Sequence, residues 1–81
     1  MINKETYRKK LIELLEMYYP DKDYRVMCRA VLISKLGGKM DEYVVKAYGS
    51  YCDNNPRAMQ AVLNEGHRLL DECLREMGIT R

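Results

Sequence analysis

The most constraining feature of this sequence is a regular stripe of apolar and small residues between positions 56 and 77. These residues recur every three or four positions, which is the spacing of one face of an α-helix. They are Met59, Val62, Leu63, Gly66, Leu70, Cys73, Leu74 and Met77. Asn55 is suited to cap this helix and Pro56 to occupy its first position. Gly78 followed by Ile79 is typical of a Schellman-type stop. The pattern predicts one helix that crosses the whole of a small domain.

The preceding sequence shows the same period, interrupted only by a few prolines and glycines. Pro20 ends the first expected helix, because the residue before a proline is driven away from helical dihedral angles. Gly37 and Gly38 are expected to end the second helix in a left-handed turn. A third helix is expected from about Asp41 to Cys52.

The apolar positions of these three helices predict how they pack. The expected N-caps are Asn3 for the first helix and Asp21 or Asp23 for the second. The expected core residues are Tyr7, Leu11, Leu14, Leu15, Tyr18, Tyr24, Met27, Cys28, Val31, Leu32, Val44, Ala47, Tyr48 and Cys52. The predicted fold class is therefore all-α, a compact four-helix domain that spans residues 1–81.

Composition narrows the class of protein. The chain has 81 residues, of which 47% are hydrophobic and 32% charged, and this fits one compact domain that is too small for a deep catalytic cleft. The net charge of +2 is too small to indicate a nucleic-acid partner by itself. The longest apolar run, residues 30–33, cannot cross a membrane, and residues 1–10 lack the apolar segment of a secretory signal. We expect a cytoplasmic protein without a membrane partner.

The cysteines do not predict a disulfide or a metal site. Cys28, Cys52 and Cys73 are odd in number, widely spaced and placed on apolar helical faces, so we expect buried free thiols. His67 and Cys73 are six residues apart on one helix, which puts them about 120° apart around its axis. We expect no metal and no cofactor. Nothing pairs a nucleophile with a base, so no catalytic residue is named and an enzyme is not expected.

The junction between the last two expected helices consists of about three residues, 53–55. Such a short junction between amphipathic helices fits a helix-turn-helix, and it also fits an antiparallel helical hairpin. A helix-turn-helix requires a small residue where its helices cross, and Gly49 supplies one. Glycine inside a helix costs about 1 kcal/mol relative to alanine, so close packing at Gly49 is the expected reason for its presence. We expect a helix-turn-helix-like pair formed by helices three and four, with the hairpin as the alternative.

Two segments resemble the C-terminal DNA-binding domain of sporulation-initiation response regulators, which is all-helical. They are KDYRVMCRAV, residues 22–31, and VVKAYGSYCDNNPRAMQAVLNEG, residues 44–66. The residues that match the family's pattern are Tyr24, Met27, Ala30, Val31, Ala47, Gly49, Pro56, Met59, Val62 and Leu63. The resemblance implies a helix-turn-helix that binds DNA through the fourth helix. The exposed side of that helix is rich in arginine in the family but has only Arg57 near its start here. Its target has therefore changed, or DNA binding has been lost.

The exposed side of the fourth helix also fits a DNA-binding surface on chemical grounds. Arginine, glutamine and asparagine make bidentate contacts to base edges, and a helix N-terminus favours a phosphate. Arg57 and Lys46 are expected to contact phosphates, while Gln60 and Asn64 are expected to contact bases. The full expected DNA-binding set is Lys46, Asn54, Asn55, Arg57, Gln60, Asn64 and Arg68. The expected function is a small cytoplasmic regulator of transcription that binds duplex DNA, with a homodimer contact at residues 71–77.

An alternative function is a helical protein–protein interaction module, for example an adaptor or inhibitor from a mobile element. The chain has seven tyrosines and six methionines but no tryptophan or phenylalanine. Tyrosine is enriched at protein interfaces, and methionine adapts to irregular partners. The partner is then a protein rather than duplex DNA.

Overall fold

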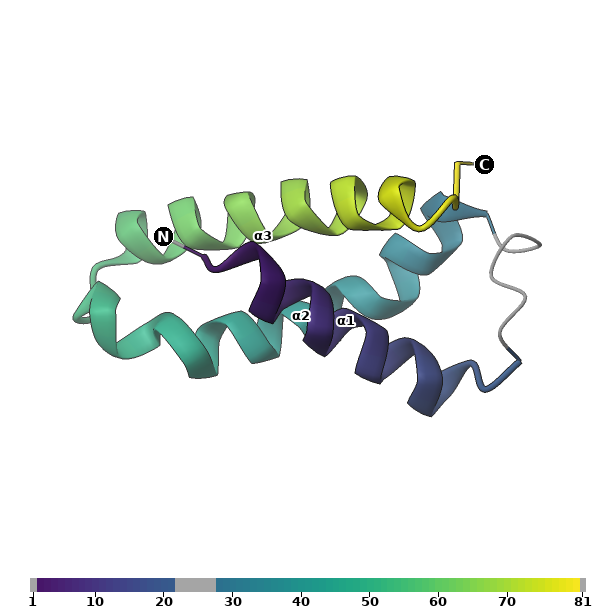
Figure 1. Cartoon of the computed structure of the whole chain (residues 1–81). Coiled ribbons are helices and arrows are strands. Elements are labelled where there is room, and N and C mark those ends of the chain that lie inside the picture. The colour runs from purple at the N-terminus through teal and green to yellow at the C-terminus, as the bar shows by residue number, and fades with distance from the viewer. Residues whose placement is uncertain (1, 22–27, 81) are drawn as a thin grey trace.

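The computed structural model describes residues 2–21 and 28–80, and this part of the chain forms three α-helices (Figure 1). They are α1 (Lys4–Tyr18), α2 (Arg29–Cys52) and α3 (Pro56–Glu76). The described residues contain no strand. The all-α prediction is therefore confirmed, but the prediction of four helices is wrong.

Helix α1 forms where the apolar period predicted it. The Asn3 side chain accepts a hydrogen bond from the Thr6 backbone N–H at 3.1 Å, which satisfies one of the free donors of the first turn. One face of the helix is buried, and its residues are Tyr7, Leu11, Leu14 and Leu15. Tyr18 was also expected in the core, but it is half exposed because it lies at the end of the helix.

The predicted end of a helix at Gly37 and Gly38 is wrong, because α2 continues through both glycines. Among the described residues the only glycine with positive φ is Gly78, so neither of the two adopts a left-handed turn. Leu36, Met40 and Val44 follow one another at four-residue spacing, and each is almost fully buried. Burial of three such side chains on one face outweighs a cost of about 1 kcal/mol for each glycine. Figure 1 shows that α2 bends along its course, as helices with adjacent glycines can.

Several core residues expected before and within α2 are placed differently. Tyr24, Met27 and the proposed cap Asp23 lie outside the described residues. Asp21 is exposed, and the N-cap of α2 is Cys28, which makes no side-chain capping bond. The predictions of buried Cys28, Val31 and Ala47 are wrong, since all three are exposed. Cys28 precedes the helix as its N-cap, and Val31 is about 100° from the buried Leu32 around the axis, so it lies off the buried face. Ala47 lies within about 20° of Leu36 and Met40 around the axis and is exposed all the same.

Helices α2 and α3 form an antiparallel hairpin, so the predicted helix-turn-helix pair is wrong. The two helices lie side by side over much of their length (Figure 1), whereas a helix-turn-helix pair crosses at about 90–120°. Asp53 and Asn54 have φ values of 47° and 59°, and this left-handed pair reverses the chain. Asn55 then caps α3, and Pro56 is its first residue, as predicted. The hairpin forms because the apolar stripes of α2 and α3 are both long enough to pair along their length.

The end of α3 also follows the prediction. Gly78 has a φ of 86° and donates its N–H to the Arg75 carbonyl at 3.0 Å. The Ile79 N–H reaches the Leu74 carbonyl at 3.0 Å, which completes a Schellman motif. Ile79 is buried, so the motif also seals the end of the core.

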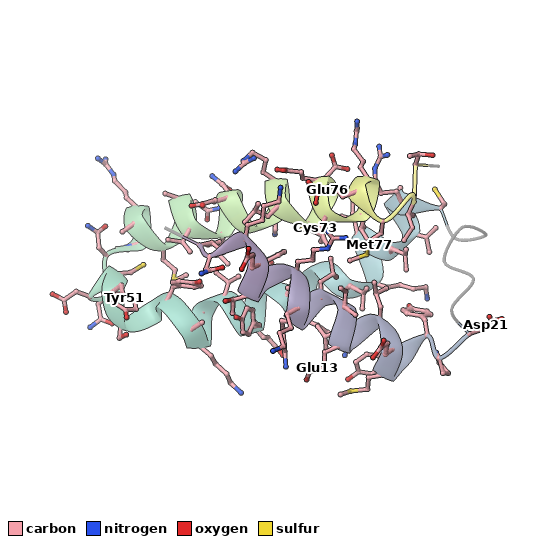
Figure 2. The ribbon with its side chains drawn as sticks, viewed as in Figure 1. Glu13, Asp21, Tyr51, Cys73, Glu76 and Met77 are labelled. Carbon is pink, nitrogen blue, oxygen red and sulfur yellow. The ribbon has the colours of Figure 1, made fainter. Side chains whose placement is uncertain are left out.

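Helix α1 lies across one side of the hairpin and closes the core there (Figure 1). Gly66 of α3 lies in this contact, where a Cβ atom would be 3.5 Å from Val44 and 3.7 Å from both Ile2 and Tyr7. The Tyr7 hydroxyl donates a hydrogen bond to the Gly66 carbonyl at 2.7 Å. Burial raises the pKa of Tyr7, which keeps the hydroxyl protonated as this donor. Cys73 points into the same interior (Figure 2).

Candidate interaction surface

Most of the residues expected to bind DNA on α3 and at its N-cap already form hydrogen bonds or an ion pair within this part of the chain. The Asn55 side chain accepts hydrogen bonds from the backbone N–H groups of Arg57 and Ala58, and it therefore serves the helix cap. Gln60 donates to Asn64 at 2.9 Å. Arg68 forms an ion pair with Glu72 at 3.1 Å.

Of the expected set, Asn54, Arg57 and Lys46 make no side-chain interaction with the described residues. Asn54 lies in the turn and Arg57 in the first turn of α3, and both are exposed. Lys46 lies on α2 instead, beside α1. The expected phosphate contacts therefore come from two parts of the molecule rather than from one recognition helix.

Lys46 belongs to a basic and aromatic cleft between α1 and α2. The cleft is lined by Lys10, Leu14, Tyr18, Lys39, Glu42, Tyr43 and Lys46. The Lys39 ammonium lies 4.3 Å from the centre of the Tyr18 ring, and that of Lys10 lies 5.8 Å from the Tyr43 ring. These are cation–π contacts, which hold two of the lysines against the protein. Partial burial raises the pKa of the Tyr43 hydroxyl, so this ring stays neutral.

The side of the hairpin away from α1 has no cover among the described residues. We call it the open hairpin face, and its apolar and small residues are Gly38, Val45 and Gly49 of α2 with Met59 and Leu63 of α3. Near the turn between α2 and α3, the face contains a hollow with a volume of about 390 Å³. No described residue of α1 lines it there or farther along the hairpin. Val45, at the middle of the face, is 46% exposed although it is a β-branched apolar residue.

The glycines give this face its shape. A Cβ atom at Gly38 or Gly49 would meet nothing within 4 Å. The predicted close crossing of helices at Gly49 is therefore wrong, and Gly49 instead leaves a shallow place on the surface. The sequence signal was available, because Gly38, Val45 and Gly49 follow one another at spacings of seven and four, which is one helical stripe. The expectation of a helix end at Gly37 and Gly38 conceals this stripe, because it assigns Gly38 and Val45 to different helices.

Polar residues surround the apolar part of the open hairpin face. His67 of α3 meets Asp41 of α2 at 2.8 Å and links the two helices. Glu42 and Lys46 line the same part of the face, and neither forms an ion pair with a described residue. At the turn, Asn54 and Asn55 line the hollow. An apolar centre with a polar rim is the usual anatomy of a protein interface.

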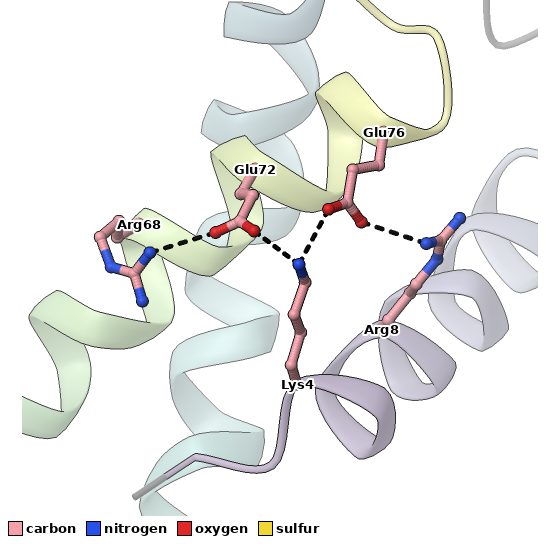
Figure 3. Close-up of polar contacts among 5 residues, drawn as sticks. All are labelled: Lys4, Arg8, Arg68, Glu72 and Glu76. Carbon is pink, nitrogen blue, oxygen red and sulfur yellow. Dashed lines mark hydrogen bonds and ion pairs between the residues drawn. The ribbon is translucent and has the colours of Figure 1, made fainter.

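The acidic end of α3 is used within the chain. Lys4 of α1 contacts Glu72 at 2.5 Å and Glu76 at 2.8 Å, and Arg8 contacts Glu76 at 3.1 Å (Figure 3). The hydrogen bond from Lys4 lowers the pKa of Glu72, and the Glu72 bond raises the pKa of Lys4. Asp71 pairs with Arg29 at 2.7 Å, which ties α3 to the start of α2. Asp71, Glu72 and Glu76 therefore already have partners within the chain. The homodimer contact expected at residues 71–77 stays a prediction.

The described residues offer no other site chemistry. They contain no group of three or more histidine, cysteine or acidic residues that could hold a metal ion. Cys52 and Cys73 are buried, and burial raises the pKa of the Cys73 thiol, which disfavours the reactive thiolate. No helix in the described ranges is long and apolar enough to span a membrane.

Comparison with protein-family models, curated proteins and solved structures finds no match for this chain. The resemblance to the response-regulator domains therefore stays a hypothesis that rests on the residues quoted above.

Proposed function

We propose that this chain is a helical protein–protein interaction module that binds its partner through the open hairpin face. The observation that carries the proposal is the uncovered apolar centre of that face, with Val45 half exposed between two glycines. The apolar stripe of a helix is usually buried against another element. The stripe on the open hairpin face has no such cover among the described residues. An amphipathic helix laid along this face would cover Val45, Met59 and Leu63 and would complete a four-helix arrangement.

Photo-crosslinking tests this function with a matched control. A benzoyl-phenylalanine in place of Val45 would react with a partner on the open hairpin face. The control is the same group in place of Val31, which is 41% exposed on the same helix but lies beyond the hollowed part of the face. We expect a covalent adduct in cells at position 45 only, and we expect Gly49→Arg to abolish it. No adduct at position 45, or equal adducts at both positions, would contradict the proposal.

A second candidate function is binding to duplex DNA, and a row of lysines favours it. Lys35, Lys39 and Lys46 lie within about 40° of one another around α2, and none forms an ion pair with a described residue. Together with Lys10 and the tyrosines of the cleft, they could follow a phosphate backbone without reading bases.

Salt dependence separates this candidate from the interaction module. If Lys46 contacts a phosphate, Lys46→Ala should flatten the log–log salt slope by about one unit on every duplex sequence. Arg57→Ala should do the same if the α3 N-terminus also contacts DNA. The absence of binding to a mixed-sequence duplex even at about 50 mM salt, where phosphate contacts are strong, would exclude this candidate.

A further inference from the structure

Four charged residues along α2 and at its end have no ionic partner within the described chain. They are Lys35, Glu42, Lys46 and Asp53, and all four are exposed. By contrast, Asp41, which faces α3, is paired with His67, and Lys39 lies on the Tyr18 ring. The unpaired charges therefore follow one edge of α2, where Glu42 and Lys46 line the open hairpin face.

Helix geometry aligns these charges. At 100° per residue, Lys35, Glu42 and Lys46 lie within about 40° around the axis of α2. Asp53 follows the last residue of the helix as its C-cap. Read along α2, the four charges without a partner are positive, negative, positive and negative in that order, while Lys39 between them lies on the Tyr18 ring.

In the reverse direction the order is negative, positive, negative and positive, so two antiparallel copies of this edge would pair opposite charges. Lys35 and Asp53 lie nine residues before and after Val44, and Glu42 and Lys46 lie two residues before and after it. A second α2 that runs antiparallel, with a twofold axis at the level of Val44, would place Lys35 opposite Asp53 and Glu42 opposite Lys46. Each of these contacts would occur twice, because a twofold interface is isologous.

We propose that the partner of the open hairpin face is a second copy of this chain, in a twofold-symmetric antiparallel dimer of α2. This inference rests on the proposed function, since it names the partner of the same surface. Val45 lies next to the axis and supplies the apolar centre. Lys39 would lie opposite Gly49 of the second copy, where the missing Cβ leaves room for its stem. The contact would extend from Lys35 to Asp53, which is about 27 Å along the helix axis.

Charge reversal tests the arrangement. Glu42→Lys would place two lysines opposite each other at two symmetric places, and Lys46→Glu would do the same with two acids. We expect each single variant to weaken dimerisation roughly tenfold or more in sedimentation equilibrium. The double variant Glu42→Lys with Lys46→Glu restores opposite charges across the axis, so it should dimerise like the wild type. Three equally weak variants, or three variants equal to the wild type, would overturn the proposed register.

A matched pair of valine variants tests the position of the axis. Val45→Asp would bury two carboxylates near the twofold axis and should leave the chain monomeric. Val31→Asp introduces the same charge on the same helix, but Val31 would lie beyond the end of the second copy's α2. It should therefore leave the dimer unchanged. The helical circular dichroism of both variants at low concentration shows whether the single chain still folds. Loss of the dimer in both folded variants, or in neither, would contradict the arrangement.

The crosslinking experiment distinguishes failure of the dimer from failure of the interaction function. An adduct at position 45 with twice the chain mass supports the second copy. A wild type that stays monomeric across the concentration series, with an adduct of another mass at position 45, overturns the dimer and leaves the interaction function standing. A monomeric wild type without any adduct contradicts both.

Discussion

At the scale of the residue, two glycines on facing helices have opposite roles. A Cβ atom at Gly49 of α2 would meet nothing within 4 Å. At Gly66 of α3 a Cβ would already be in van der Waals contact with Val44, Ile2 and Tyr7. The Gly66 carbonyl also accepts the Tyr7 hydroxyl, so the backbone there is held against α1. Gly66 is therefore the residue that permits close packing, a role that the sequence had assigned to Gly49.

This contrast gives a stability prediction. Gly49→Ala should stabilise the single chain by up to about 1 kcal/mol, because alanine favours the helix and nothing opposes its methyl group. Gly66→Leu should destabilise it by about 1–3 kcal/mol, because the longer side chain would enter a filled core. Urea denaturation at low protein concentration, followed by circular dichroism, measures both free energies of unfolding. A destabilised Gly49→Ala variant would show that residue 49 is in fact packed within the chain.

At the scale of the element, local signals predicted helix ends well where a cap or turn decides them. Asn3, Asn55 and Gly78 all act as their side chains or φ preference predicted. Gly37 and Gly38 did not, because their preference for a turn is weak compared with burial of the neighbouring Leu36 and Met40. The continuation of α2 through Gly37 and Gly38 therefore depends on packing between distant parts of the chain, and a local sequence pattern does not contain that information.

The same limit applies to the candidate site. The sequence correctly predicted that α3 exposes Arg57, Gln60 and Asn64. The hydrogen bond between Gln60 and Asn64 joins residues four positions apart on α3, a spacing at which such side chains meet, so its signal was present in the sequence. The place of Lys46 beside α1 rather than beside Arg57 could not be predicted, because it depends on the path of α2 through Gly37 and Gly38. The open hairpin face follows from the same continuity of α2, which places Gly38, Val45 and Gly49 on one helical stripe.

At the scale of the whole molecule, the hairpin sets the shape and α1 depends on it. The molecule measures 40 × 21 × 20 Å, and the 24 residues of α2 account for about 36 Å of the long dimension. Helix α1 is much shorter, with 15 residues, and it is held to α3 by the buried Tyr7 and by the ion pairs of Lys4 and Arg8. Its attachment therefore combines a core contact, which does not respond to pH near neutrality, with a surface network that does respond to acid.

The last prediction concerns that network. The hydrogen bond from Lys4 lowers the pKa of Glu72 in the folded chain relative to the unfolded chain, where it is about 4.3. Glu72 therefore contributes stability that is fully present above about pH 4.3 and is lost as the pH falls through its lowered folded value. The pKa of Lys4 is raised, so its contribution is present at neutral pH and is lost only at strongly alkaline pH. We expect Glu72→Gln to lower the urea midpoint at pH 7 but to match the wild type near pH 2.

The matched control for this prediction is Glu16→Gln, an exposed acid on α1 that forms no ion pair with a described residue. Its urea midpoint should differ little from that of the wild type at either pH. Added salt should reduce the effect of Glu72→Gln at pH 7, because exposed ion pairs are screened. A difference between wild type and Glu72→Gln that persists unchanged at pH 2, or that does not exceed that of Glu16→Gln at pH 7, would show that the network does not hold α1 to the hairpin.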